Sequence, residues 1–116
     1  MSENSKTIFK KIIDGEIPAE IVHEDDHCLA FNDIAPQAPI HILVIPKKEI
    51  PNLNAIGSED LPLVGHIFAA IQKITRDLGV EQSYRLISNC GEDAGQTVHH
   101  LHFHILAGRH LKWPPG

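Results

Sequence analysis

The spacing of apolar residues predicts a short helix near the start of the chain. Between Thr7 and Asp14 the apolar side chains recur at helical spacing, and Gly15 follows directly. Asn4, Ser5 or Thr7 could cap the helix, because short polar side chains accept hydrogen bonds from the first free backbone N–H groups. We therefore expect one short amphipathic helix here.

A second, longer helix is predicted over Leu63 to Leu78. Its apolar positions fall on one face when the segment is wound as a helix. These positions are Leu63, Val64, Ile67, Phe68, Ile71, Ile74 and Leu78. Ser58 or Asp60 could cap the start, and Gly79 suits the left-handed residue that commonly ends a helix.

Five runs have the composition and length of β-strands. They are Glu20 to Glu24, His27 to Asn32, Ile40 to Ile45, Tyr84 to Asn89 and Val98 to Leu106. The first two runs flank the turn-prone pair Asp25 and Asp26, so they predict a hairpin. The third run is apolar except for His41 and lies between two prolines, which predicts a central strand covered on both faces.

These elements predict an α+β fold. Strands in adjacent runs with one long and one short helix favour an antiparallel five-stranded sheet with helices on one face. With 116 residues, we expect a single domain over 1–116.

Charge and composition narrow the function classes. The net charge is −5 and the lysines are scattered, so we expect no duplex nucleic acid as a partner. The apolar runs are too short to span a bilayer, and the start lacks a secretory pattern, so we expect no membrane association. Cys28 and Cys90 stand apart in the sequence, which favours a reducing cytoplasm over a disulfide framework.

The segment His99 to Leu106 carries the most informative pattern. Side chains alternate between the two faces of a strand, so His100, His102 and His104 should share one face. Nine histidines are many for this length, and imidazole is the side chain that titrates nearest neutral pH. The alternation therefore predicts a chemical site built from three imidazoles.

Three interpretations of this pattern remain open. The histidines could be solvent-exposed and incidental, or two of them could bind zinc and leave a catalytic position open. The preceding loop, Gly91 to Thr97, favours a third interpretation, in which the guest is a phosphate. Gly91 and Gly95 allow backbone N–H groups to approach an anion, and Gln96 and Thr97 add side-chain donors, although a plain hairpin turn would look similar.

Imidazole suits phosphoryl chemistry without a metal. Its neutral form is a nucleophile, and its cation is a general acid and a donor to phosphoryl oxygens. Such a transfer mainly requires in-line positioning and charge stabilisation. We therefore expect neither a metal nor another cofactor.

The pattern H-x-H-x-H followed by two apolar residues resembles the signature of the histidine triad, or HIT, superfamily. The segments TIFKKIIDGEIPAEIVHEDD, AFNDIAPQAPIHILVIPK, NCGEDAGQTVHHLHFHILAGR and WPPG are similar to its nucleotide-binding branch over nearly the whole chain. The resemblance implies a HIT-like fold whose sheet continues across a homodimer. His104, where transferase relatives have Gln, favours hydrolysis.

The resemblance also implies a role for each matching residue. His102 corresponds to a nucleophile that forms a nucleotidyl-histidine, and His100 and His41 to a supporting proton relay. The implied substrate-binding residues are Asp33 at the ribose hydroxyls, Asn89 near the ribose and 5′ oxygen, Ile34, Gly95, Gln96, Thr97 and, from a partner protomer, Trp113. Without the resemblance, Asp33 could be a turn residue, His41 a core histidine and Asn89 a strand cap.

The expected function is hydrolysis of the P–N bond in purine nucleoside 5′-phosphoramidates. Alternatives are a dinucleoside polyphosphate hydrolase, a deadenylylase, or a nucleotide-binding adaptor with vestigial catalysis. The tail, Arg109 to Gly116, should form an irregular arm because its two prolines fix φ and lack N–H groups.

Overall fold

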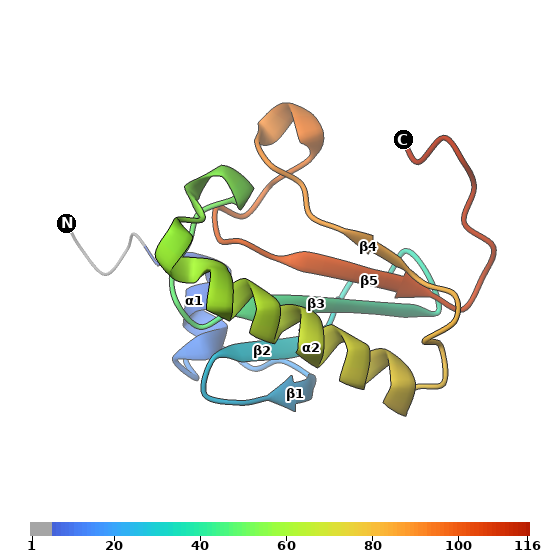
Figure 1. Ribbon diagram of the computed structural model, residues 1–116, viewed down its shortest axis with the longest axis horizontal. Coiled ribbons are helices and arrows are strands. Elements are labelled where there is room, and N and C mark those ends of the chain that lie inside the picture. The colour runs from blue at the N-terminus through green and yellow to red at the C-terminus, as the bar shows by residue number, and fades with distance from the viewer. Residues whose placement is uncertain (1–5) are drawn as a thin grey trace.

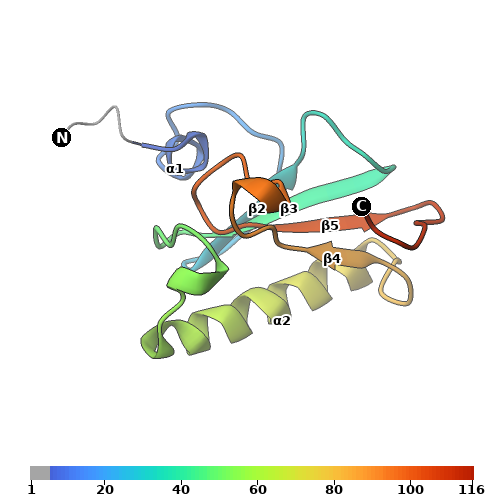
Figure 2. The same ribbon diagram turned by 90° about the horizontal axis from the view of Figure 1, so that it is seen from above.

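A computed structural model describes residues 6–116 as a five-stranded antiparallel sheet with helices on both faces (Figures 1 and 2). The strands are β1 (Ile21–Glu24), β2 (Cys28–Asn32), β3 (Ile40–Pro46), β4 (Arg85–Ile87) and β5 (Phe103–Ala107). Their order across the sheet is β1-β2-β3-β5-β4, and each pair is antiparallel. The predicted α+β class and hairpin are confirmed.

Strand β3 is the centre of the sheet, as its apolar sequence predicts. It pairs with β2 on one side and β5 on the other, and every residue after Ile40 is buried. In its register with β5, Leu43 lies opposite His104. Since opposed residues of an antiparallel pair share a face, His41, Leu43 and His104 all point to the same side of the sheet.

Helix α2 (Leu61–Asp77) covers the other side. Ile67, Ile71 and Ile74 on the helix pack with β-strand residues such as Val44 and Ile105. The helix begins two residues before the predicted Leu63, with Pro62 in its first turn, and its turn at Gly79 has a φ of 73°. Of the predicted apolar positions, Phe68 and Leu78 remain 45% and 44% exposed, although the Phe68 ring packs edge-on against Phe103 in the core.

Helix α1 (Ile8–Ile13) lies on the face opposite α2, so the expectation that helices cover only one face is wrong (Figure 2). Thr7 caps it, with its hydroxyl oxygen accepting from the Lys10 backbone N–H, while Asn4 and Ser5 lie outside the described residues. Phe9 packs on β2 and β3 residues that point away from α2. The apolar sequence of the central strands is thus satisfied by one helix on each side.

The predicted strand Val98 to Leu106 is shorter than expected, because β5 begins only at Phe103. Two residues before β5 bond instead to the end of β3 and to the segment that follows it. The Leu101 N–H donates to the Ile50 carbonyl, and the His100 ring donates to the Pro46 carbonyl. These bonds replace the sheet ladder and leave His100 and Leu101 about 1% exposed. The regular strand therefore does not reach His100, although Leu101 still packs in the core under α2 and His100 still faces Phe9 on the α1 side.

Within residues 6–116 no helix is both long enough and apolar enough to cross a membrane.

Candidate active site

The side chain of His102 is held with one nitrogen free. Its Nδ1 lies 2.7 Å from the backbone oxygen of His100. A carbonyl only accepts, so Nδ1 carries the proton and Nε2 keeps its lone pair. The edge of the Phe9 ring packs against the imidazole, with ring centroids 4.9 Å apart. His102 thus has the tautomer that a nucleophile needs.

His104 is joined to His41 across the sheet. The backbone N–H of Gln37 donates to His41 Nδ1 at 3.0 Å, which places the His41 proton on Nε2. That nitrogen lies 2.9 Å from His104 Nδ1 and donates to it. A neutral His104 therefore carries its own proton on Nε2. Asp33 completes the row, with Oδ2 3.5 Å from His41 Nε2.

All of these imidazoles are neutral at pH 7. Burial lowers the pKa of His102 and His41 below the ordinary 6.5, and Asp33 only partly opposes it. Burial, helped by the neighbouring His102 and His41, lowers the pKa of His104 to about 4. A neutral His102 is nucleophilic, and a neutral His104 is a hydrogen-bond donor through Nε2.

His100 differs from the role suggested by the sequence. Its Nε2 donates to the Pro46 carbonyl at 2.9 Å, and its side chain is buried. His100 shares the α1 side of the sheet with His102, since the Phe9 ring packs against both imidazoles with centroids 6.2 and 4.9 Å away, but its own ring is engaged by a backbone carbonyl. Its backbone carbonyl contributes instead, because that oxygen orients the His102 ring.

A cavity of about 390 Å³ opens beside His102 and His104. Asp33, Ile34 and Thr97 line it, so the structure brings five of the predicted site residues together. Ile34 is 98% exposed. The remaining walls are largely apolar and were missed by sequence reasoning: Ile8, Phe9, Ile12, Ile17, Pro18, Ala19, Phe31, Asn32, Leu43 and Val98. The apolar stripe of α1 was visible in the sequence, but its placement over β2 and β3 was not.

The glycine-rich loop before β5 is folded tightly. Gly91 and Gly95 have φ angles of 91° and 100°, which favour glycine, and a short 3-10 turn, Glu92–Ala94, lies between them. Gln96 holds this turn. Its Oε1 accepts from the Gly91 N–H, and its Nε2 donates to the carbonyls of Pro51 and Val98. The expectation that the Gln96 side chain offers free donors is therefore corrected.

Asn89 and Trp113 lie apart from this cavity. Both line a separate hollow of about 530 Å³ beside β4. Asn89 approaches the loop, since a Cβ on Gly95 would lie 3.5 Å from its Nδ2. Trp113 is 79% exposed in an irregular tail, as its prolines predict, so it covers little of the rest of the chain.

One group at this site has donor atoms suited to a metal. The ligand atoms of Asp33, His41 and His104 lie within 4.8 Å of one another. His102 is outside that group. Its free Nε2 thus remains available for attack on a substrate whatever the other three residues bind.

The comparisons with known proteins identify the family. A model of the HIT domain matches residues 14–111, which is most of the chain. The chain belongs to the HIT family. An uncharacterized HIT-like protein of Synechocystis sp. is 56% identical over 110 residues, covering 95% of this chain and 96% of that protein. Another, from Synechococcus elongatus, is 55% identical over the full length of both chains.

Solved structures of HIT proteins have the same fold. A HIT family hydrolase from Legionella pneumophila superposes with a TM-score of 0.93 at 45% identity, covering 96% of this chain and 100% of that one. A histidine triad protein from Clostridium difficile gives 0.89 at 49% identity, with 96% and 97% covered. This HIT protein is therefore similar to hydrolases of its family in both sequence and structure.

Proposed function

We propose that this HIT protein hydrolyses the P–N bond of purine nucleoside 5′-phosphoramidates through a nucleotidyl-histidine. The observation that carries the proposal is the state of His102, which is neutral and keeps a lone pair on Nε2 beside the cavity. Nε2 would attack the α-phosphorus, the amine would leave, and water would then release the nucleoside monophosphate. No cofactor enters the proposed reaction.

His104 and His41 support the two transfers in this proposal. The Nε2–H of His104 would donate to the leaving group or a phosphoryl oxygen, because its Nδ1 is already engaged by His41. That bond also fixes the orientation of the His104 ring. Fixed donors favour the transition state because they need no rearrangement as charge develops.

The cavity suits a nucleoside in size and chemistry. Ligand sites combine apolar walls with a few placed polar groups, and this cavity of about 390 Å³ has that composition. The apolar walls would hold the base, and Asp33 would accept from the ribose hydroxyls. Thr97, at the cavity, and the backbone of Gly95 would face the phosphate, while Gln96 holds that loop in place.

Rapid quenching without acid, followed by intact mass measurement, tests the proposal. Mixing the protein with adenosine 5′-phosphoramidate should add one adenylyl group to the chain, and the adduct should disappear as AMP is released. The same adduct formed faster from a diadenosine polyphosphate would favour the polyphosphate hydrolase. AMP binding with no adduct and no turnover would favour the adaptor.

A further inference from the structure

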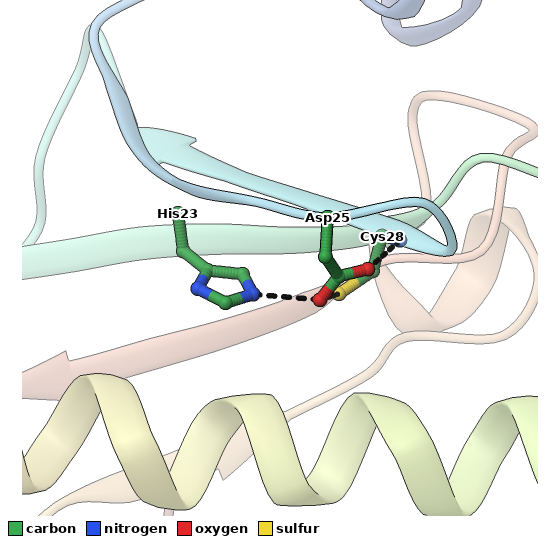
Figure 3. A group of neighbouring side chains, drawn as sticks. All are labelled: His23, Asp25 and Cys28. Carbon is green, nitrogen blue, oxygen red and sulfur yellow. Dashed lines mark hydrogen bonds and ion pairs between the residues drawn. The ribbon is translucent and has the colours of Figure 1, made fainter.

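A second cluster of reactive side chains lies in the β1–β2 hairpin, on the α2 side of the sheet. Figure 3 shows His23, Asp25 and Cys28 turned toward one another above α2. Cys28 packs in the core under α2, whereas the His102 cavity is on the α1 side. The cluster is thus separated from the candidate active site by the sheet itself.

Three potential ligands converge on one oxygen of Asp25. His23 Nε2 lies 2.8 Å from Oδ2, His66 Nε2 of α2 lies 2.9 Å from it, and Cys28 Sγ lies 3.4 Å away. The other oxygen, Oδ1, accepts from the backbone N–H groups of His27 and Cys28. Those two bonds fix the carboxylate, so Oδ2 is held at the centre of the cluster.

The distances are close to those of a tetrahedral metal site. Ligand atoms about 2.0 to 2.3 Å from one zinc ion are roughly 3.3 to 3.8 Å apart. The ligand atoms of His23, Asp25 and Cys28 all lie within 4.8 Å of one another. Small side-chain rotations would therefore suffice to place a cation among them.

The donor set selects the kind of metal. Imidazole and thiolate ligands suit zinc and similar borderline cations, while magnesium and calcium prefer oxygen alone. We propose that His23, Asp25 and Cys28 bind a zinc-class divalent cation, with His66 as the fourth ligand. The Asp25 carboxylate and the Cys28 thiolate would then balance the two charges of the ion, and the thiol proton would pass to solvent.

Four protein ligands would make this site structural, since no position is left for a substrate. The ion would join α2, through His66, to the hairpin that carries the other three ligands. His66 is already oriented by its neighbour, because the His27 ring packs edge-on against it with centroids 4.9 Å apart. Burial raises the pKa of the Cys28 thiol to about 12, so without a metal this cysteine is an inert core residue.

Cobalt and zinc titrations of the full chain, after exhaustive chelation, test the proposal. One equivalent of cobalt should produce tetrahedral visible bands and a thiolate-to-cobalt charge-transfer band, and zinc should displace it. Replacing a residue that hydrogen-bonds to a metal ligand often costs 10- to 100-fold in metal affinity. Loss of a direct ligand should therefore cost about 100-fold or more. We expect this loss in His23→Gln, Cys28→Ala and His66→Gln.

Two control variants separate this cluster from other histidines. His110→Gln, in the exposed tail, should bind cobalt like the unmodified chain. His104→Gln removes a ligand of the Asp33, His41 and His104 group, which contains no sulfur. The charge-transfer band should therefore persist in His104→Gln and vanish in Cys28→Ala.

Thermal unfolding gives an independent readout, because an ion that binds only the folded chain raises the melting temperature. Zinc should raise it in the unmodified protein and leave His23→Gln unchanged. His23 is partly exposed, so we expect His23→Gln to fold. This variant therefore tests the proposal even if circular dichroism shows that Cys28→Ala does not fold. Absence of the thiolate band, or equal affinities in His23→Gln and the unmodified chain, would overturn the proposal.

Discussion

The histidines around β5 differ in chemistry because their ring nitrogens contact different groups. His102 donates through Nδ1 to a carbonyl, His104 accepts through Nδ1 from His41, and His100 donates to the Pro46 carbonyl. Each bond fixes a tautomer. Residue type alone would make the three imidazoles equivalent. Because their contacts differ, only His102 keeps a free lone pair beside the cavity.

Replacing His102 by glycine should remove turnover but not binding. The variant loses the nucleophile and keeps Asp33 and the cavity walls, so we expect kcat to fall on the order of 10³-fold or more. Single-turnover kinetics would measure the loss, and calorimetry with AMP would show that binding remains. Retention of a tenth of the original kcat would exclude covalent catalysis by this residue.

The buried imidazoles should make the protein less stable in mild acid. The folded-state pKa values of His41, His100, His102 and His104 all lie below the ordinary 6.5, that of His104 at about 4. Between these values the unfolded chain binds more protons than the folded one, so the free energy of unfolding falls as pH drops from 6.5 toward 4. Urea titrations from pH 7.5 to 4.5 would measure this.

The matched variant for that pH series is His104→Gln. It removes the imidazole with the most strongly lowered pKa, so its free energy of unfolding should depend less steeply on pH over the same range. A slope equal to that of the unmodified chain would show that His104 is not protonated preferentially in the unfolded state.

At the scale of elements, the site depends on two segments that flank the sheet. Helix α1 supplies apolar walls to the cavity, and the loop from Gly91 to Gln96 leads directly into Thr97, which also lines it. The loop has little regular structure of its own. Its conformation rests on the two left-handed glycines and on the three hydrogen bonds of the buried Gln96 amide.

Gln96→Ala should therefore destabilise the protein and slow turnover, although its side chain has no spare donor for a phosphate. Unsatisfied buried polar groups cost roughly 1 to 3 kcal/mol, and a shifted loop should also lower kcat/KM. Urea unfolding and steady-state kinetics measure the two effects. Gln82→Ala, at an exposed glutamine, is the control and should change stability by less than about 0.5 kcal/mol.

At the scale of the whole molecule, the end of the C-terminal arm packs little against the rest of the chain. Arg85 holds its start through the carbonyls of Leu111 and Lys112, but Trp113 beyond them is largely exposed. We propose that the protein is a homodimer and that this arm reaches the site of the partner protomer. The indole would then meet the leaving group of the substrate rather than the nucleotide.

Deleting Leu111 to Gly116 should change selectivity among leaving groups. The expected result is an altered ratio of kcat/KM for indole-bearing and simple alkyl phosphoramidates, because contacts on the amine side act only where those transition states differ. AMP affinity and the mass from sedimentation should stay nearly unchanged. An unchanged ratio would exclude the role at the leaving group, and dissociation into monomers would show that the arm mainly holds the dimer together.

Local sequence patterns were sufficient to predict the helices and strands and to recognise the family. Apolar runs placed the central strand, both helices and the hairpin within a few residues, because burial of apolar side chains requires those periodicities. The H-x-H-x-H motif marked the segment that carries His102 and His104. Both features are encoded by neighbours along the chain.

Only the tertiary structure decided how those pieces meet. The sequence pattern put His100 on a strand face and gave Gln96 free donors, but long-range bonds to Pro46 and Pro51 bury the first and engage the second. The placement of α1 opposite α2, which creates the cavity beside His102, likewise depends on contacts between distant segments. Periodicity determines which side chains are apolar together, whereas packing determines which nitrogen is left with a lone pair.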